Sequence, residues 1–347
     1  MSTIKRNWFE GKISDIPLKP PHDRGVFCVD INSTNIVTGS ADHGLRVWDL
    51  KTGKYCRELY GKRYGHHEWV TTVAYLNNGK CISGAMDGML CLWEKNIVKC
   101  DTLKGHKTSV SKLKVDQNNI CISSSYDCTL NLWDLDNTLK SDKLYGPHKN
   151  AVMDFAWNNS LVVSGDKDGV VAFWDINSMD SFRKLKAHGG PVTSIDFYSD
   201  DVNTHLISTV GGKDGILCVH DMRSDKVAYK QQIHGGAINK VATNMSGLII
   251  TCSADKTCCL IDPQSGFKEV GRLQCNDAAF TFCTAWGYTA VGCGDGNLLV
   301  FDNDSCKVLW GFGVMNLGAV HAMKVSDDCS RLVCVGDDPT SLLMNFT

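Results

Sequence analysis

Residues 65–94 read GHHEWVTTVAYLNNGKCISGAMDGMLCLWE, a stretch with three short runs of alternating apolar and polar residues. The runs are separated by Asn-Asn-Gly and Asp-Gly, which favour tight turns between antiparallel strands. No helical period of 3.6 is sustained over ten residues here or elsewhere in the chain. The stretch therefore predicts three consecutive strands, the third ending at Trp93, and the whole chain predicts an all-β fold.

The same pattern recurs along the chain with a period of 40 to 46 residues. In four copies a turn aspartate precedes a tryptophan by six residues: Asp42 and Trp48, Asp87 and Trp93, Asp127 and Trp133, Asp168 and Trp174. Four weaker copies keep the aspartate without the tryptophan: Asp214, Asp255, Asp295 and Asp338. Because this period is that of a four-stranded propeller blade, the eight copies predict eight blades.

A histidine followed four residues later by Val or Ile marks the start of the first six copies: His22, His66, His106, His148, His188 and His234. With Trp48-Asp49, Trp133-Asp134 and Trp174-Asp175, these residues resemble the WD-repeat β-propeller family over residues 11–346. The resemblance implies a buried hydrogen-bonded chain in each strong copy. Its members in the second copy would be Asp87, His66, Ser83 and Trp93. The corresponding residues elsewhere would be His22, Asp42 and Trp48; His106, Asp127 and Trp133; His148, Asp168 and Trp174.

The two ends of the sequence predict how the fold closes. Residues 11–16 read like residues 53–58, the segment ahead of His66, whereas residues 319–346 supply three strands and no fourth. We therefore predict an eight-bladed propeller of four-stranded antiparallel sheets, closed by an N-terminal strand that completes the last blade; seven blades is the alternative. Residues 11–347 would form a single propeller domain, and residues 1–10 a short N-terminal extension.

Composition narrows the function classes. The chain has 347 residues, with 36 Lys+Arg against 38 Asp+Glu, which excludes the strongly basic profile of an electrostatic nucleic-acid binder. No stretch approaches the roughly 18 apolar residues of a membrane helix. Seventeen cysteines without any Cys-x-x-Cys are expected to be reduced thiols of an intracellular protein. We expect no metal, no cofactor, no small-molecule substrate, and no direct nucleic-acid or membrane partner.

Ser or Thr, His and Asp occur together in every strong copy and could be taken for a hydrolase triad. A catalytic group of this kind is expected once, facing solvent, whereas this one recurs with the repeat and is linked to a buried tryptophan. We therefore predict that these residues are structural and that the protein is not an enzyme.

The turns before the aspartates and the loops after the histidines are free of packing and are the predicted partner surface. Trp69, Met86 and Tyr126 come from adjacent copies and could form one apolar patch, the composition that interface cores favour. The other candidates are basic: Arg24, Lys112, Lys167, Lys213 and Lys240.

These features favour a non-enzymatic scaffold or adaptor subunit of a larger protein assembly. A substrate receptor of a cullin-type ubiquitin ligase is an alternative, since Asp221-Met222-Arg223 is similar to a docking motif of some propellers. A ribosome-associated signalling scaffold is another. The expected location is cytoplasmic, with cytoskeletal or ciliary assemblies as a further hypothesis by analogy of fold.

Overall fold

The computed structural model describes residues 3–61, 64–137, 141–144, 146, 148–198, 206–212, 214–221 and 227–347. These residues contain one α-helix and thirty-two β-strands, so the all-β prediction is confirmed. The chain divides into two compact units. The first unit is Met1–Leu144 with Val314–Thr347, and the second unit is Tyr145–Gly313.

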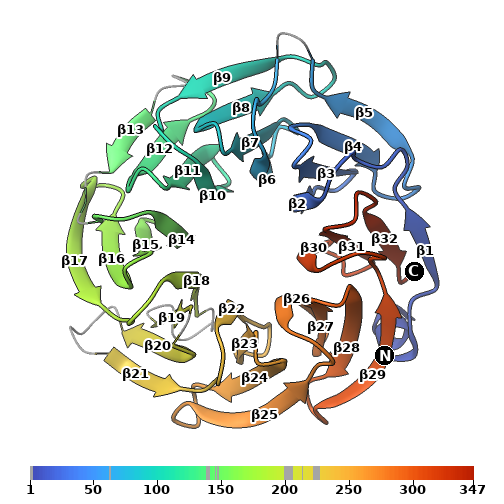
Figure 1. Ribbon diagram of the computed structural model, residues 1–347, viewed down its shortest axis with the longest axis vertical. Helices are drawn as coiled ribbons and strands as arrows, with labels where there is room; N and C mark the ends of the chain where they lie inside the picture. Colours follow the sequence, from blue (N-terminus) through green and yellow to red (C-terminus); the bar gives the residue numbers. More distant parts are fainter. Residues whose placement is uncertain are drawn as a thin grey trace. The chain divides into compact units, whose positions relative to one another are not determined.

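Three sheets of the first unit follow one another along the chain, each with its strands paired in sequence order (Figure 1). The first contains β2 (Val26–Ile31), β3 (Asn35–Ser40), β4 (Leu45–Asp49) and β5 (Tyr55–Leu59). The second contains β6 (Val70–Tyr75), β7 (Cys81–Ala85), β8 (Met89–Trp93) and β9 (Cys100–Lys104). The third contains β10 (Val110–Val115), β11 (Ile120–Ser125), β12 (Leu130–Asp134) and β13 (Ser141–Leu144).

The fourth sheet of the first unit joins the two ends of the chain. Its strands are β30 (Val320–Val325), β31 (Arg331–Gly336), β32 (Leu342–Asn345) and β1 (Ser14–Pro17). β1 pairs antiparallel with β32, with Ser14 opposite Asn345 and Pro17 opposite Leu342, and Figure 1 shows the blue and red strands side by side. The predicted pairing of an N-terminal strand with three C-terminal strands is confirmed.

The second unit contains four more sheets of the same kind. They are β14 (Val152–Asn158), β15 (Leu161–Asp166), β16 (Val170–Asp175) and β17 (Asp180–Lys186); then β18 (Val192–Phe197), β19 (Leu206–Gly211), β20 (Ile216–Asp221) and β21 (Val227–Gln232). The last two are β22 (Ile238–Thr243), β23 (Ile249–Ser253), β24 (Thr257–Asp262) and β25 (Lys268–Gln274), then β26 (Ala279–Ala285), β27 (Tyr288–Cys293), β28 (Asn297–Asp302) and β29 (Lys307–Gly313).

The described residues thus form eight four-stranded antiparallel sheets, one for each sequence copy. The eight-bladed ring and its seven-bladed alternative both stay predictions.

An Asp-Gly pair favours the turn between the second and third strands in several of the sheets. Gly88 and Gly169 follow the turn aspartate and adopt positive φ angles of 76° and 85°. At Gly169 a Cβ atom would lie too close to the carbonyl oxygen of His188, so a side chain would fit neither the φ angle nor the space. The Asp-Gly pair therefore reverses the chain between the second and third strands.

Apolar side chains between neighbouring sheets form the core. In the second unit, Val163 and Phe173 of one sheet pack with Val192 and Phe197 of the next, and Cys218 joins the same cluster. A sheet with two apolar faces cannot bury both by itself, and stacking on the next sheet removes them from water.

Residues ahead of β1 form a helix, α1 (Thr3–Glu10). Its Trp8 is fully buried and stacks on Phe346, with ring centroids 4.2 Å apart. The indole N–H of Trp8 donates to the carbonyl oxygen of Cys329 at 2.8 Å, and Asn7 donates to that of Phe346. The extension predicted at residues 1–10 thus includes a side chain that packs in the last sheet. At eight residues, this helix is the only one in the described ranges and is too short to span a bilayer.

Candidate functional site

A buried hydrogen-bonded chain recurs in the sheets, as the family resemblance implies. In the sheet of β6–β9, Trp93 Nε1 donates to Ser83 Oγ at 2.9 Å, and Ser83 Oγ lies 2.7 Å from His66 Nε2. His66 Nδ1 lies 3.2 Å from the Asp87 carboxylate. Because an indole N–H can only donate, Ser83 accepts from Trp93 and gives its own proton to His66 Nε2. His66 therefore carries its proton on Nδ1 and donates it to Asp87.

The same chain links His106, Asp127, Ser123 and Trp133 in the third sheet. In the first sheet His22 bonds to Asp42 and to Thr38, but Trp48 Nε1 has no hydrogen-bond partner among the described residues. The predicted members of these three hydrogen-bonded chains come together. In the first sheet Thr38 takes the place of the serine, and there the hydrogen bond to the tryptophan is missing.

The fourth copy corrects one predicted member. His148 Nδ1 bonds to the carboxylate of Asp166 at 2.9 Å and not to Asp168. Asp166 occupies the position of Ser40 and Ser125 in other copies, two residues before the turn aspartate. Its longer, charged side chain reaches the histidine from there, and Asp168 instead accepts from Asn150 at 2.9 Å. The predicted Trp174 and His148 are linked through Ser164, which the sequence analysis did not name.

Burial and hydrogen bonding set the charge state of these groups. Burial by itself raises the pKa of Asp87 and Asp166, but hydrogen bonds from a histidine and from backbone amides outweigh it, so both carboxyls have a pKa below the usual value. In the sixth copy burial likewise acts to raise the pKa of Asp255. A hydrogen bond from Thr257 and the other hydrogen bonds outweigh it and lower this pKa to about 2. Ser83, Ser123 and Ser164 are fully buried, so no substrate reaches these hydroxyls. The networks hold the loop onto the sheet, and their chemistry is structural.

Replacing Asp166 with alanine is expected to destabilise the fold by about 1–3 kcal/mol. The change leaves the Nδ1 proton of His148 and the backbone amides of Asp168 and Val170 without their acceptor. Asp168→Ala removes one bond from the Asn150 side chain and is the matched control, expected below about 1 kcal/mol. Chemical denaturation measures both; a larger cost for Asp168→Ala would contradict the assignment of Asp166.

The predicted apolar partner residues lie on the first unit and are partly exposed. Trp69 is 37% exposed, Met86 44% and Tyr126 48%. Trp69 and Met86 are held together because the amide of Met86 donates to the carbonyl oxygen of Trp69 at 2.9 Å. Tyr126 occupies the corresponding turn of the third sheet, where its amide donates to Ser109. Arg24 is exposed in the loop before β2.

Two aromatic residues that the sequence analysis missed extend this surface. Phe27 stacks on Trp69 with ring centroids 5.6 Å apart, and its ring centroid also lies 5.3 Å from that of His321. His321 Nε2 bonds to the Asp337 carboxylate at 2.7 Å. Phe27, Trp69 and His321 thus form an aromatic row contributed by three sheets: those of β2–β5, β6–β9 and β30–β32 with β1.

A β-bulge places two members of this row. In every sheet the pairing register shifts at the second residue of one terminal strand: β2, β6, β10, β14, β18, β22, β26 or β30. This second residue is Phe27 in β2 and His321 in β30. Bulges redirect a side chain away from the sheet pattern. Thr71, Thr193 and Asn239 occupy the same position in other sheets and bond to the backbone of the next sheet along the chain. Phe27 is aromatic at a position where these other copies carry a hydrogen-bonding side chain. This difference was the signal in the sequence that could have identified Phe27 as a surface residue.

The described basic partner candidates are divided between the two units. Lys240 is corrected: its ammonium donates to the carbonyl oxygen of Phe282 at 2.8 Å and lies over the Phe282 ring, because the long side chain reaches across to β26. Lys112 is half-buried in β10, and Lys167 is exposed on the second unit. Lys213 lies outside the described residues, as do Met222 and Arg223 of the suggested ligase motif. A basic border around the apolar patch stays a prediction.

Within the described ranges, no group of three His, Cys, Asp or Glu side chains could hold a metal ion. All seventeen cysteines are free thiols, and most are buried. Burial raises the pKa of Cys28 and Cys81 to about 12, so these thiols stay protonated and pack as small apolar groups.

Comparison with known proteins identifies the repeat. The family described as "WD domain, G-beta repeat" matches residues 17–49, 57–94, 98–134, 140–175 and 179–221, together more than half of the chain. Among curated proteins, Mitochondrial division protein 1 of Kluyveromyces lactis is 26% identical over 52% of this chain and 30% of its own length. Autophagy-related protein 16 of Arabidopsis thaliana is 26% identical over 49% of this chain and 34% of its own. The chain spans about a third of the length of these two relatives.

Among solved structures, the crystal structure of the computationally designed Ika8 protein superposes with a TM-score of 0.82 at 22% identity. The match covers 94% of this chain and 98% of that protein. At this identity the likeness concerns the fold alone.

Proposed function

Because this chain belongs to the WD-repeat family, whose members fold as β-propellers of four-stranded sheets, we propose that it is a non-enzymatic scaffold that binds other proteins through the aromatic row and the neighbouring Met86. The observation that carries the proposal is the partly exposed stack of Trp69, Phe27 and His321. Aromatic residues and methionine are enriched in the cores of protein interfaces, and tryptophan is frequent among the residues that contribute most to binding.

The geometry also supports a rigid binding surface. Each member of the row comes from a different sheet, and the bulges and Asp-His bonds fix the backbone under them. A surface that is already ordered loses little conformational entropy when a partner binds. Closure of all eight sheets into one eight-bladed ring is part of this proposal and is supported by the count of sheets and by the β1–β32 pairing.

The printed names of the two curated relatives refer to different processes, mitochondrial division and autophagy. What this chain shares with both is the propeller, so the proposal concerns protein binding and not a particular assembly. We also propose an intracellular location, because free thiols in this number are typical of a reducing compartment.

Replacing both Phe27 and Trp69 with alanine is expected to weaken partner binding at least tenfold, because truncating the few aromatic residues that dominate an interface costs about 2 kcal/mol or more. Phe280→Ala with Trp286→Ala is the matched control, since both are 39% exposed aromatic residues of the second unit. Tyr126→Ala tests whether the surface extends to the third sheet. The measurement is quantitative pull-down from native cells with mass spectrometry, together with the melting temperature of each variant. Partners that bind the folded Phe27/Trp69 variant as well as the parent would place the interface elsewhere.

A further inference from the structure

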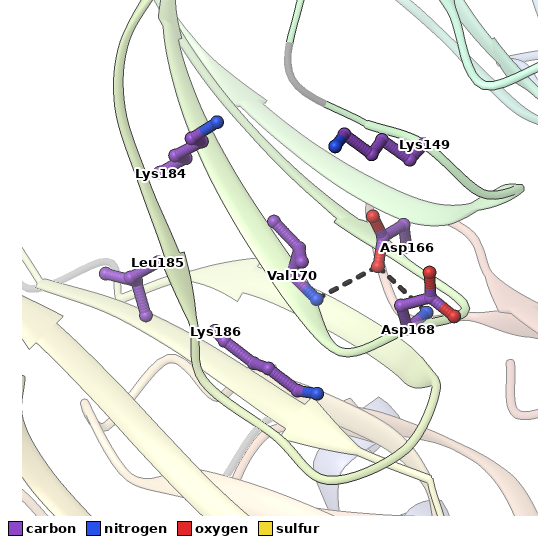
Figure 2. Close-up of a pocket in the computed structure, with 7 residues that line it drawn as sticks. All are labelled: Lys149, Asp166, Asp168, Val170, Lys184, Leu185 and Lys186. Atoms are coloured by element: carbon purple, nitrogen blue, oxygen red, sulfur yellow. Dashed lines mark hydrogen bonds between the residues drawn. The ribbon is translucent and has the colours of Figure 1, made fainter.

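A hollow of about 330 Å³ opens beside the outer strand of the sheet β14–β17 (Figure 2). All of its described lining residues belong to the second unit: Lys149, Asp166, Asp168, Val170, Lys184, Leu185 and Lys186. Neither the predicted partner surface nor the aromatic row includes this hollow, which we name the lysine hollow.

Two separate segments supply its positive charge. Lys184 and Lys186 lie two residues apart on β17 and are exposed. They share one face of the sheet with Val170, because Lys186 pairs with Val170 and side chains two residues apart point the same way. Lys149 comes from the loop ahead of β14, and in the view of Figure 2 its side chain and that of Lys184 extend toward one another across the hollow.

The carboxylates in the hollow form no ion pair with these lysines. None of the ion pairs among the described residues includes Lys149, Lys184 or Lys186. Asp166 is engaged with His148 through one oxygen and with the amides of Asp168 and Val170 through the other, as the dashed lines in Figure 2 partly show. The ammonium groups of Lys149 and Lys184 therefore face one another without forming an ion pair, whereas that of Lys186 lies apart from them in Figure 2.

Lysines on an edge strand have an ordinary role, because they discourage pairing with other chains. Two observations go beyond that role here. Lys149 is not on the edge strand, yet it lines the same hollow as Lys184 and Lys186. Val170 and Leu185 give the hollow an apolar wall, which suits the methylene groups of a side chain that ends in a negative charge.

We propose that the lysine hollow binds an acidic segment of a partner protein, with a glutamate side chain placed between Lys149 and Lys184. The outer edge of β17 is not paired with any other strand in the described part of the chain, so an extended peptide has room to lie along it. A peptide backbone can hydrogen-bond to this free strand edge whereas a nucleic-acid backbone lacks the alternating N–H and C=O groups, which favours a peptide over a nucleic acid. The inference rests on the proposed scaffold function and adds a second surface with a stated partner chemistry.

Fluorescence anisotropy with a fluorescein-labelled hexaglutamate peptide tests the proposal on the full chain, with hexaglutamine as the neutral probe. The triple variant Lys149→Ala, Lys184→Ala, Lys186→Ala is expected to bind hexaglutamate at least tenfold more weakly. The control variant replaces three exposed lysines of the first unit, Lys51, Lys95 and Lys99, with alanine and is expected to bind as the parent does. Asp168→Asn is expected to bind several-fold more tightly, since it removes a repelling charge while keeping an acceptor for Asn150.

Three outcomes would overturn the proposal: no binding of hexaglutamate by the parent, equal binding by a folded triple variant, or equal binding of hexaglutamine. Tighter binding of a single-stranded DNA oligonucleotide, lost in the same triple variant, would reassign the hollow to nucleic acid. Failure here is distinguishable from failure of the scaffold function. Partner capture that needs Phe27 and Trp69 but not the three lysines would leave the scaffold in place and remove only the second surface.

Discussion

Deletion of residues 1–18 is expected to lower the melting temperature by about 10 °C or more. The deletion removes β1, whose four residues pair with β32, and leaves the last sheet with three strands. It also removes the fully buried side chains of Trp8 and Leu18. The exposed edge of β32 and the uncovered Phe346 would then face water. Differential scanning fluorimetry of the deletion variant and the parent measures the effect.

A point substitution separates the helix from the strand. Trp8→Ala keeps β1 and is expected to cost about 3–5 kcal/mol, the range for truncating a large aromatic residue in a core. Phe9→Ala is the matched control, because Phe9 lies next to Trp8 on the same helix and its side chain is 51% exposed. This substitution is expected to cost below about 0.5 kcal/mol. Equal stability of the two variants in chemical denaturation would show that α1 does not hold the last sheet.

Acid is expected to destabilise the protein through His220, which stands where four other copies carry tryptophan. Burial lowers the pKa of His220 to about 4, and the positive charges of Arg183, His188 and Lys230 act in the same direction. Between pH 6.5 and pH 4 the unfolded chain therefore binds a proton at this residue that the folded chain does not. The free energy of unfolding falls as the pH falls through this window, by about 2–3 kcal/mol from pH 7 to pH 4.5.

His220→Phe is the variant that tests this linkage, since Phe301 is buried at the corresponding position of another copy. Urea denaturation at pH 7 and pH 4.5 is expected to show a smaller loss for this variant than for the parent. His67→Ala, a substitution of an exposed histidine, should keep the parent's pH dependence. His188 and His234 add to the loss in both proteins, because burial also lowers the pKa of each below its usual value. An unchanged pH dependence in His220→Phe would contradict the assignment.

Local sequence determined the repeating architecture. Alternation of apolar and polar residues defines each strand, and an aspartate followed by a residue at positive φ, glycine in several copies, reverses the chain. The Asp, His and Trp positions recur in a pattern that resembles the WD repeat, and that resemblance implied the networks seen around His66 and His106. Even the pairing of the two ends could be predicted, because residues 11–16 repeat the pattern of residues 53–58.

Only the tertiary structure decided which side chains contact one another between different segments of the chain. Asp166 and Asp168 are two residues apart and equally acidic, and only the backbone geometry of the loop shows that the first of them meets His148. Trp8 belongs to no repeat, so its burial against Phe346 had no periodic signal. Phe27, Trp69 and His321 are brought together by the stacking of sheets and the closing strand, although the sequence separates them by up to 294 positions. A repeat specifies each sheet from within, whereas contacts between sheets depend on stacking and bulge geometry that no single copy contains.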